Sequence, residues 1–499
     1  MALLKTSAEA REILEKLRRA GVRPNLWARA ALGYSLSLTA DPENTTYDSE
    51  GTEFQEPTFF GQDDKETLLA LLRQRLGSVP DQSELGALIK NHVERGLRFF
   101  SEQYEHLNRR GDELMLHLLS LAASVPTAEP VRRVLPELPD VRSYALELDI
   151  GVEERTGRPV KYTLNAPGAS PHLAIMGRNG TGKTRTGLKL LRSLKERGPY
   201  KVPFLIFDYA KGDIAENQEF VRATDARVVR LPDQAIPLNP LSLADVGEHA
   251  SQIAARKFRN TITSVVRLGP KQLSHCLQLI TQLYRDSGFN PTLPELVALA
   301  EHEYQMNDWP DDSLLSCLRE FAAFPLFEPG NESDIRELFE HNHIIDIHRL
   351  PEDLRKLTVF LVLDRLYSEI MAVPDAPLDQ EDNRQQRLLI VIDEAHHYLP
   401  CRQATLQDMV REVRSKGVGV WLFSQSPDDF DQPQYNFARE MGLSIVFSCV
   451  LERPRMLEAL LGGKIEPTRL SQLRSGVALC RVPGSTNIAE VRLWAAEGK

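Results

Sequence analysis

Gly177-Arg-Asn-Gly-Thr-Gly-Lys-Thr184 is the stretch of this sequence that decides its fold, because it matches the pattern GxxxxGK[ST] at every fixed position. An apolar segment, His172–Met176, comes directly before it and reads as a strand, and the segment from Lys183 to Arg197 reads as a helix. A strand, a glycine-rich loop and a helix in this order form a phosphate-binding loop, or P-loop. The alternative, a chance glycine-rich turn, does not account for the strand and the helix on either side.

The residue types of this loop suit a bound phosphate chain. Glycines let the backbone approach the phosphates closely, and the N–H groups of the loop and of the helix N-terminus point at the anion. Lys183 is expected to neutralise charge on the β- and γ-phosphates, and Thr184 to offer a hydroxyl to Mg²⁺. The predicted nucleotide-binding residues are Gly177, Arg178, Asn179, Gly180, Thr181, Gly182, Lys183, Thr184 and Arg185.

The second part of the site is expected at the end of a neighbouring buried strand. Leu388–Ile392 is apolar throughout, which suits a strand buried on both faces, and Asp393 and Glu394 follow it. Asp393 would join Thr184 in holding Mg²⁺, and Glu394 would orient and deprotonate the attacking water. A kinase that hands phosphate to a small substrate would not need a water-activating glutamate here, and it would require an acceptor pocket. The sequence therefore predicts ATP hydrolysis, with ATP and Mg²⁺ as cofactors.

Two further residues are candidates for catalysis. The strand Val418–Ser424 ends in Gln425, whose amide could sense the γ-phosphate or hold the water, unless it is an ordinary polar strand end. Three basic residues precede this strand on a helix that ends at Gly417: Arg411, Arg414 and Lys416. In a ring, one such arginine can reach the ATP of the neighbouring subunit, and we favour Arg414. The alternative is a solvated basic helix end, stabilised by the helix macrodipole. The predicted catalytic residues are Lys183, Glu394, Gln425 and Arg414.

Two groups of histidines could suggest a metal site. They are His396 and His397, shortly after the predicted carboxylates, and His341, His343 and His348, around the predicted strand Ile344–Ile347. Neither group matches a zinc motif, since HExxH would need a histidine at the position of Asp393. We expect structural histidines in both places.

The composition is that of an ordinary globular protein, with 42% hydrophobic and 26% charged residues among 499. No apolar stretch approaches the roughly 20 residues that cross a bilayer, and the N-terminal segment reads as a charged amphipathic helix and not as a signal peptide. Five widely spaced cysteines fit reduced thiols in a cytoplasm and give no zinc ribbon. We therefore expect a cytoplasmic protein with no membrane partner. The net charge of −10 argues against a uniformly basic surface for DNA but allows a local one.

The sequence divides into blocks of different character. Residues 1–125 read as a small all-α domain, 126–142 as a proline-containing linker, 143–242 and 341–499 as two parts of an α/β domain, and 243–340 as a helical insertion. In the α/β parts strands alternate with helices, which implies a mostly parallel sheet. The expected strands are a hairpin of Tyr144–Ile150 and Val160–Leu164, then Val202–Phe207, Ile344–Ile347, Leu388–Ile392, Val418–Ser424 and Leu443–Cys449. The expected helices of the first block are Ser7–Arg19, Leu26–Leu38, Glu66–Leu76, Glu84–Phe100 and Asp112–Ala123, with a polar loop over Asp41–Glu56.

Several motifs occur in a fixed order around these elements. They are Leu148-Asp-Ile-Gly151, Phe207-Asp-Tyr-Ala-Lys-Gly-Asp213, Ile236-Pro-Leu-Asn239, Ile392-Asp-Glu-Ala-His396, Arg414-Ser-Lys-Gly-Val-Gly419, Ser424-Gln-Ser-Pro427 and Leu473-Arg-Ser-Gly476. In this order and spacing, residues 140–499 resemble the HerA/FtsK superfamily of DNA-pumping ATPases. The helical insertion also looks like that of HerA-type members, and the lack of transmembrane helices favours the soluble HerA branch.

This resemblance implies a RecA-like P-loop core and a hexameric ring that draws duplex DNA through a central channel, with ATP bound between subunits. By the matched positions, it assigns hydrolysis to Lys183, Thr184, Asp393, Glu394 and Gln425, and the trans-acting role to Arg414. One feature departs from the family, because HerA proteins usually begin with a β-barrel and this sequence begins with helices and a short hairpin.

The front of the sequence carries a second set of motifs. They are Lys5-Thr-Ser-Ala-Glu9, Leu17-Arg-Arg-Ala-Gly-Val-Arg-Pro-Asn25, Ala28-Arg-Ala-Ala-Leu-Gly-Tyr-Ser-Leu36, Gly51-Thr-Glu-Phe54, Pro57-Thr-Phe-Phe-Gly61 and His92-Val-Glu-Arg-Gly96. With them, residues 1–110 look like DndE, the small DNA-binding protein of DNA phosphorothioation systems. Seven basic and three acidic side chains in the first 30 residues give a local positive excess that suits DNA phosphates. The DNA-binding candidates are Lys16, Arg18, Arg19 and Arg23, and the alternative is a charged helix face with pairs such as Glu12–Lys16 and Glu15–Arg19.

Two functions remain open at this point. The first is a ring-shaped ATPase that moves along double-stranded DNA in a phosphorothioation-linked modification or anti-phage defence system. The second is a nucleotide-gated DNA-binding scaffold that recruits a nuclease or modification partner and hydrolyses ATP only to reset. The sequence has no recognisable nuclease motif, so cutting would need a partner protein in either case.

Overall fold

The structure is a computed structural model in which residues 2–18, 23–37, 42, 47–55, 59, 82–106, 114, 141, 143–243, 249–287, 290–328, 334–481 and 488–494 are described. The chain forms two compact units, Met1–Arg132 and Arg133–Lys499. The predicted helices over 66–76 and 112–123 lie outside the described residues, apart from residue 114, and so does the predicted linker over 126–142, apart from residue 141.

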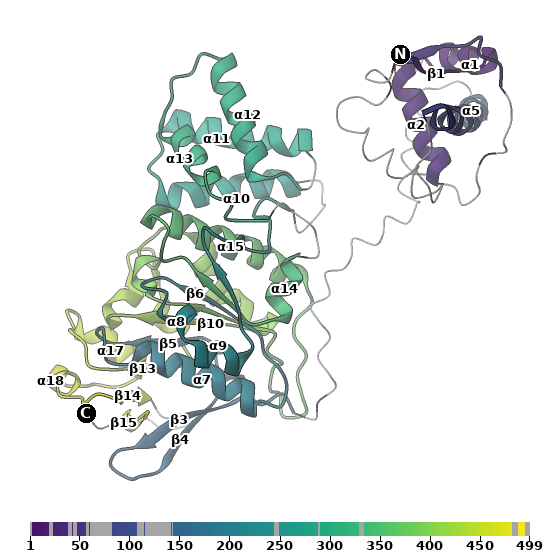
Figure 1. Ribbon diagram of the computed structural model, residues 1–499. Coiled ribbons are helices and arrows are strands. Elements are labelled where there is room, and N and C mark those ends of the chain that lie inside the picture. Colours follow the sequence, from purple (N-terminus) through teal and green to yellow (C-terminus); the bar gives the residue numbers. More distant parts are fainter. Residues whose placement is uncertain are drawn as a thin grey trace. The chain divides into compact units, whose positions relative to one another are not determined.

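The first unit is built on three described helices, α1 (Ala8–Arg18), α2 (Pro24–Ser37) and α5 (Gln82–His106) (Figure 1). Their apolar faces meet in one core, in which Leu14, Trp27 and Phe100 are buried. The Trp27 and Phe100 rings pack edge to face, 5.8 Å apart. The helices predicted at the start of the sequence and around residue 90 are therefore confirmed.

This unit also contains a short antiparallel pair of strands, β1 (Ala2–Lys5) and β2 (Glu53–Gln55). The prediction of an all-α domain, with a polar loop over Asp41–Glu56, is wrong at these two segments. Three or four residues are too few to show the two-residue period of a strand. Each strand is stabilised by a partner from a distant part of the sequence, and such long-range pairing leaves no local signal.

The second unit is organised around one mixed sheet, which has eleven strands in the described part of the chain. In spatial order they are β4 (Pro159–Thr163), β3 (Glu147–Glu153), β15 (Ile488–Arg492), β14 (Val477–Arg481), β13 (Leu443–Val446), β5 (Leu173–Met176), β10 (Val418–Ser424), β9 (Leu388–Ile392), β6 (Phe204–Asp208), β8 (His343–Asp346) and β7 (Arg227–Arg230). The strands from β13 to β7 run parallel, and the pairings from β13 back to β4 are antiparallel. The predicted α/β fold with a mostly parallel sheet is confirmed.

Helices cover both faces of this sheet (Figure 1). One face carries α7 (Lys183–Arg197), α8 (Asp213–Glu216) and α9 (Gln218–Thr224), and the other carries α15 (Glu352–Ala372) and α16 (Ala404–Glu412). Successive residues of β5 alternate between the two cores: Leu173 and Ile175 pack on the α7 side, and Ala174 and Met176 on the α15 side. Central strands buried on both faces read as continuous apolar runs, as Leu388–Ile392 does.

Further helices fill the chain between β7 and β8. They are α10 (Ala250–Val265), α11 (Pro270–Ser287), α12 (Leu293–Met306), α13 (Ser313–Ala322) and α14 (Asp334–Glu340). Local signals set where two of them begin, because Thr292 and Glu295 form a capping box at α12 and Asp312 caps α13. α10 packs against α15, so these helices extend the core on that face of the sheet (Figure 1).

The remaining elements are short. They are the 3₁₀ helices η1 (Ala395–His397), η2 (Val413–Lys416), η3 (Pro427–Phe430) and η4 (Phe437–Arg439), the helices α17 (Pro454–Leu461) and α18 (Pro467–Ser471), and the strand pair β11 (Asp431–Gln432) and β12 (Tyr435–Asn436). The strands predicted for the second unit are all present, each within a few residues of its expected bounds, whereas β7, β14 and β15 were not predicted. Among the described helices, none is both long and apolar enough to cross a membrane.

Candidate nucleotide site

The candidate site lies at the edge of the sheet where the parallel strands β5, β10, β9 and β6 end. Parallel strands place the segments that follow them at one edge, and ligands of such sheets bind there. Backbone hydrogen bonds join these segments: the Gly177 N–H donates to the Ser424 carbonyl at 3.2 Å, and the Asp393 N–H donates to the Phe207 carbonyl at 3.3 Å. The structure therefore brings together the P-loop, the carboxylates after β9 and Gln425 after β10.

The glycines of the P-loop allow its shape. Gly180 and Gly182 have φ angles of 80° and 103°, in the left-handed region that other residues rarely adopt. A methyl group at Gly177 would lie 2.6 Å from Cβ of Phe447, so no larger residue fits there. Gly182 is also the residue before α7 and has no side chain to cap it, so the first N–H groups of α7 remain available to an anion.

Lys183 reaches across the loop from the first turn of α7. Its Nζ donates to the Gly177 carbonyl at 2.9 Å and to Asn179 Oδ1 at 3.4 Å, and its side chain is 5% exposed. A buried ammonium held among loop oxygens is placed to meet phosphates at the centre of the loop. Thr184 is half-buried in the same turn, and Thr181 donates its hydroxyl to the Arg178 carbonyl. The outer residues of the predicted set are exposed: Arg178, Asn179, Gly180 and Arg185.

Asp393 is a buried carboxylate beside this loop. Its side chain is 5% exposed, and its Oδ1 has no hydrogen-bond partner among the described residues. Burial raises the pKa of Asp393 to about 8, and the charges of Glu394 and Asp208 add to the effect. A buried carboxylate oxygen without a partner fits a ligand of Mg²⁺, a cation that prefers oxygen ligands and is usually shared between protein carboxylates and phosphates.

Glu394 is held in a strained backbone conformation among polar neighbours. Its φ of 48° is in the left-handed region, where the backbone of a residue other than glycine is strained by about 1–3 kcal/mol. Gln425 Nε2 donates to Glu394 Oε2 at 3.2 Å, His396 Nδ1 lies 3.2 Å from the same oxygen, and Lys183 Nζ lies 4.0 Å from Oε1. Burial would raise the pKa of the Glu394 carboxyl, but the His396 ring and the Lys183 ammonium outweigh it, so the pKa is lowered. The Glu394 carboxyl therefore stays ionised at neutral pH, close to the lysine of the P-loop.

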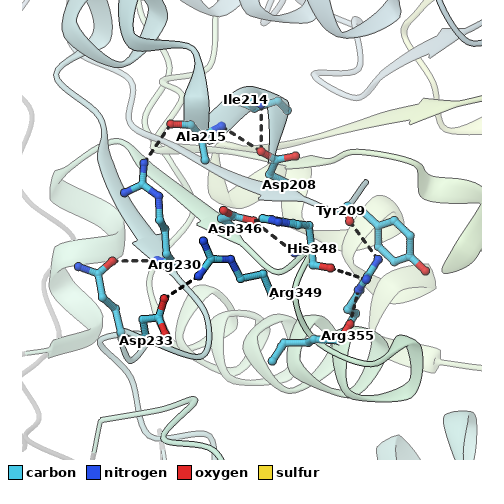
Figure 2. A network of polar contacts seen from close by, with 12 residues as sticks. Asp208, Tyr209, Ile214, Ala215, Arg230, Asp233, Asp346, His348, Arg349 and Arg355 are labelled. Atoms are coloured by element: carbon cyan, nitrogen blue, oxygen red, sulfur yellow. Dashed lines mark hydrogen bonds and ion pairs between the residues drawn. The ribbon is translucent and has the colours of Figure 1, made fainter. Parts of the chain in front are cut away.

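A network of polar contacts holds the segment after β6 (Figure 2). Asp208 Oδ2 accepts hydrogen bonds from the N–H groups of Ile214 (3.0 Å) and Ala215 (2.9 Å) at the start of α8. Burial raises the pKa of Asp208 to about 6, against the lowering effect of the Ala215 hydrogen bond. On the next strand, Asp346 Oδ1 lies 2.5 Å from Nδ1 of His348. These contacts fix the turn that follows β6, next to Asp393.

Two neighbours of the site were missed by the sequence interpretation, which assigned no role to Asp208 and a structural role to His396. The charge of Asp208 contributes to the raised pKa of Asp393, and His396 contacts Glu394. A signal existed for Asp208, because it ends a predicted strand and so had to lie at the same sheet edge as Asp393. The position of His396, in a 3₁₀ turn after Glu394, follows no periodic pattern that the sequence reveals.

Arg414 lies at the opposite edge of the sheet from this site. It belongs to η2, which leads into β10, whereas Gln425 follows the end of that strand, so a seven-residue strand separates the two by roughly 20 Å. The charge of Arg414 acts on Tyr162 and His172, and His172 lies at the start of β5, away from the P-loop. The structure thus does not bring Arg414 to the P-loop of its own chain.

The basic residues around Arg414 differ in their contacts. Arg411 Nη2 lies 3.1 Å from Glu412 Oε1, and Lys416 Nζ lies 3.0 Å from Asp375 Oδ1. Arg414 is exposed, and its guanidinium makes no ion pair within the described ranges. Of the three predicted candidates, Arg414 is therefore the one whose charge stays open to a partner.

The DNA-binding candidates belong to the first unit. Lys16 Nζ lies 2.6 Å from Glu105 Oε1 on α5, and not against Glu12 as the charged-face alternative expected. Arg18 and Arg23 are exposed, and Arg19 lies outside the described residues. Arg18 and Arg23 are thus open to solvent, whereas the charge of Lys16 is partly neutralised within the unit.

Comparison with known protein families gives two matches. The family described as DNA sulphur modification protein DndE matches residues 3–108, and the family described as helicase HerA, central domain, matches residues 150–366. Residues 3–108 are thus similar to the DndE family, and residues 150–366 are similar to the HerA central domain. The HerA match includes the P-loop, whereas the predicted metal ligand Asp393 and the predicted catalytic residues Glu394, Arg414 and Gln425 lie beyond its end.

Relatives and solved structures also match this chain. The DNA import protein CedB of Sulfolobus acidocaldarius is 23% identical over 341 residues, which are 66% of this chain and 53% of CedB. The DNA double-strand break repair helicase HerA of Saccharolobus solfataricus is 24% identical over 329 residues, which are 62% of this chain and 60% of that protein. The chain therefore spans only about half to three fifths of these relatives' length. VirB4 of Thermoanaerobacter pseudethanolicus aligns with a TM-score of 0.56 and 17% identity, over 72% of this chain and 98% of VirB4, and so has the same fold.

Asp393→Asn is expected to stabilise the ligand-free protein. Because the folded pKa of Asp393 is raised to about 8, the folded state keeps a proton that the unfolded chain has lost, and the free energy of unfolding falls as pH rises from about 4 through 8. Neutral Asn avoids this cost and should raise the free energy of unfolding by about 1–3 kcal/mol at pH 8. Thermal melting at pH 5 and pH 8 measures the gain, with Asp286→Asn, on the exposed surface of α11, as the control. An Asp393→Asn protein that melts no higher than the native chain at pH 8 would contradict the unpaired state of this carboxylate.

Proposed function

We propose that this protein is an ATP-hydrolysing motor that moves along double-stranded DNA. The observation that carries the proposal is Asp393, a buried carboxylate beside the P-loop whose Oδ1 has no partner among the described residues. It fits a Mg²⁺ ligand, and it lies next to an ionised glutamate that could activate water. The HerA central domain supports DNA as the track, since the two matching relatives are named as a DNA repair helicase and a DNA import protein.

The residues of the site would divide the work of hydrolysis. The loop N–H groups and Lys183 hold the β- and γ-phosphates, while Asp393 and Thr184 supply the oxygens for Mg²⁺. When bound, the cation neutralises part of the phosphate charge. Glu394, which the lowered pKa keeps ionised, accepts the proton of the attacking water. Gln425 donates to Glu394 and so fixes the direction of that carboxylate.

Hydrolysis would take place between the subunits of a ring, and we propose a homo-hexamer. Arg414 supports this arrangement, because it is exposed at the sheet edge that its own P-loop does not occupy. Head-to-tail contacts between identical subunits close into rings and bring different surfaces of two copies together. An arginine supplied in this way stabilises charge on the transferred phosphoryl group and accelerates hydrolysis by about 10³- to 10⁵-fold in other NTPases.

The DndE domain supports a role in DNA sulphur modification. Its family is named for that process, and exposed Arg18 and Arg23 could contact DNA phosphates without reading sequence. We therefore propose that the motor acts in a phosphorothioation-linked modification or anti-phage defence system. Any cutting of DNA would be done by a nuclease or modification partner that the motor recruits.

ATP turnover is expected to rise when duplex DNA is added and to be lost in Lys183→Ala and in Glu394→Gln. Lys183→Ala removes the ammonium that holds the phosphates and should weaken ATP binding, whereas Glu394→Gln should bind ATP normally and fail at the chemical step, by a factor of about 100 or more. Phosphate release with and without duplex DNA measures turnover. Turnover that ignores DNA of every form, modified or unmodified, would contradict the proposal.

The scaffold alternative is favoured by the match of residues 3–108 to DndE, because such a domain would let the chain hold DNA without movement by the motor. Single-molecule tracking on duplex DNA separates the two functions. A motor moves in one direction and only with hydrolysable ATP. Binding without such movement would favour the scaffold and refute the motor.

Mixed subunits test whether Arg414 acts in trans. Arg414→Ala and Glu394→Gln should each lower turnover by at least about 100-fold when assembled alone. Mixing the two variants should restore a measurable fraction of the native ATP turnover, because some subunit interfaces then combine an intact Arg414 with an intact Glu394. Arg411→Ala is the matched control, since that arginine already pairs with Glu412, and it should keep turnover within about twofold. A mixture no more active than the separate variants would rule out the trans role.

A further inference from the structure

Trp494 lies directly against the P-loop. A methyl group at Gly182 would be 2.0 Å from Cη2 of the indole ring, so the ring is in van der Waals contact with that glycine. The centroid of the Phe447 ring lies 5.5 Å from that of the indole, and the Arg185 guanidinium lies 5.3 Å from the indole centroid, over its face. Gly182 and Arg185 both belong to the predicted nucleotide-binding stretch, so the indole borders the phosphate site itself.

The backbone around Trp494 holds it in this position. The preceding residue, Leu493, donates its N–H to the Gly476 carbonyl at 2.8 Å, and its carbonyl accepts a hydrogen bond from Lys189 Nζ at 2.8 Å. Lys189 is part of α7, so the chain after β15 is tied to the helix that begins at the P-loop. Gly476 has a φ of 80°, and a methyl group there would lie 3.1 Å from Trp494 Nε1. The indole is thus positioned by its backbone, and Trp494 is only partly buried, so part of the residue is open to a ligand.

The order of the strands shows which end of a nucleotide would meet the indole. β10 and β9 lie on one side of β5, and β13, β14 and β15 lie on the other. Glu394, which would activate the water, follows β9, and Trp494 follows β15. A nucleoside polyphosphate that places its terminal phosphate beside Glu394 and crosses the P-loop therefore directs its sugar and base toward Trp494.

We propose that Trp494, together with the Arg185 guanidinium, is the platform on which the base of the bound nucleotide stacks. The inference rests on the proposed function, because it requires the P-loop to bind a nucleoside polyphosphate. Aromatic rings and guanidinium planes attract nucleobases through dispersion and cation–π forces, and every base offers a π-face. Trp494 thus contributes affinity for the base without choosing between adenine and guanine.

Binding of Mg-ADP and of Mg-pyrophosphate to the full chain tests this role. Both probes offer two phosphates to the P-loop, but only ADP has a base. Trp494→Ala is expected to weaken ADP binding about tenfold and to change pyrophosphate binding less than about twofold, whereas Trp494→Phe, which still stacks, should stay within about threefold of the native chain for both probes. Native pyrophosphate affinity in Trp494→Ala also shows that the variant is folded at the site.

Tryptophan fluorescence gives a second readout. ADP should quench part of the emission of the native chain, and this quenching should be lost in Trp494→Phe and retained in Trp309→Phe, whose indole stacks on His275 in the helical insertion. Equal losses of ADP and pyrophosphate affinity in Trp494→Ala, or unchanged ADP affinity, would overturn the base platform and leave the phosphate site standing. Failure of the native chain to bind pyrophosphate would instead overturn the phosphate site on which the inference rests.

Discussion

Three carboxylates, Asp393, Glu394 and Asp208, converge at one edge of the sheet, and the burial of Asp393 beside the charges of the other two is the constraint on which the site depends. The pKa of Asp393 is raised and that of Glu394 is lowered, so neighbouring residues of one turn are set for different tasks. Asp208 is stabilised by backbone N–H groups, and Glu394 by Gln425 and its other polar neighbours. For Asp393 Oδ1 the described residues provide no such partner. A divalent cation shared with phosphate oxygens would offset the cost of ionising the buried Asp393, so the ligand-free protein keeps a local instability that nucleotide binding would remove.

The parallel sheet makes this convergence possible. β5 pairs with β10, and β6 pairs with β9, although the members of each pair come from distant parts of the sequence, and all four strands end at the same edge. Helices on both faces bury the central strands, and this close packing fixes the positions of the strand ends from which the loops of the site extend. The antiparallel strands β14 and β15 extend the sheet beyond β13 and carry Trp494 back to the P-loop. This edge thus carries the carboxylates Asp393 and Glu394 on the β9 side of β5 and the indole of Trp494 on the β15 side.

Much of this could be predicted from the sequence, because the P-loop and the strand that ends in Asp393 are local patterns. The glycines and the lysine of the loop occupy fixed positions, and a strand buried on both faces is apolar at every residue. The rest depends on contacts between distant segments. β1 and β2, as well as β7, are too short to show a period, and the pairing of β14 with β15 decides where Trp494 lies. For Arg414 the sequence suggested a role and the structure supplied its position, at the edge opposite its own P-loop.

The central claim is that the ATP site is completed between subunits of a ring assembled on DNA. Its most direct test is the mass of the assembly in solution, measured with a non-hydrolysable ATP analogue, Mg²⁺ and duplex DNA present. We predict a DNA-bound species whose protein mass is about six times the 56.3 kDa of one chain. When the analogue is withheld, the ring should dissociate into smaller species. A protein that remains a single chain of 56.3 kDa under those conditions would contradict the account.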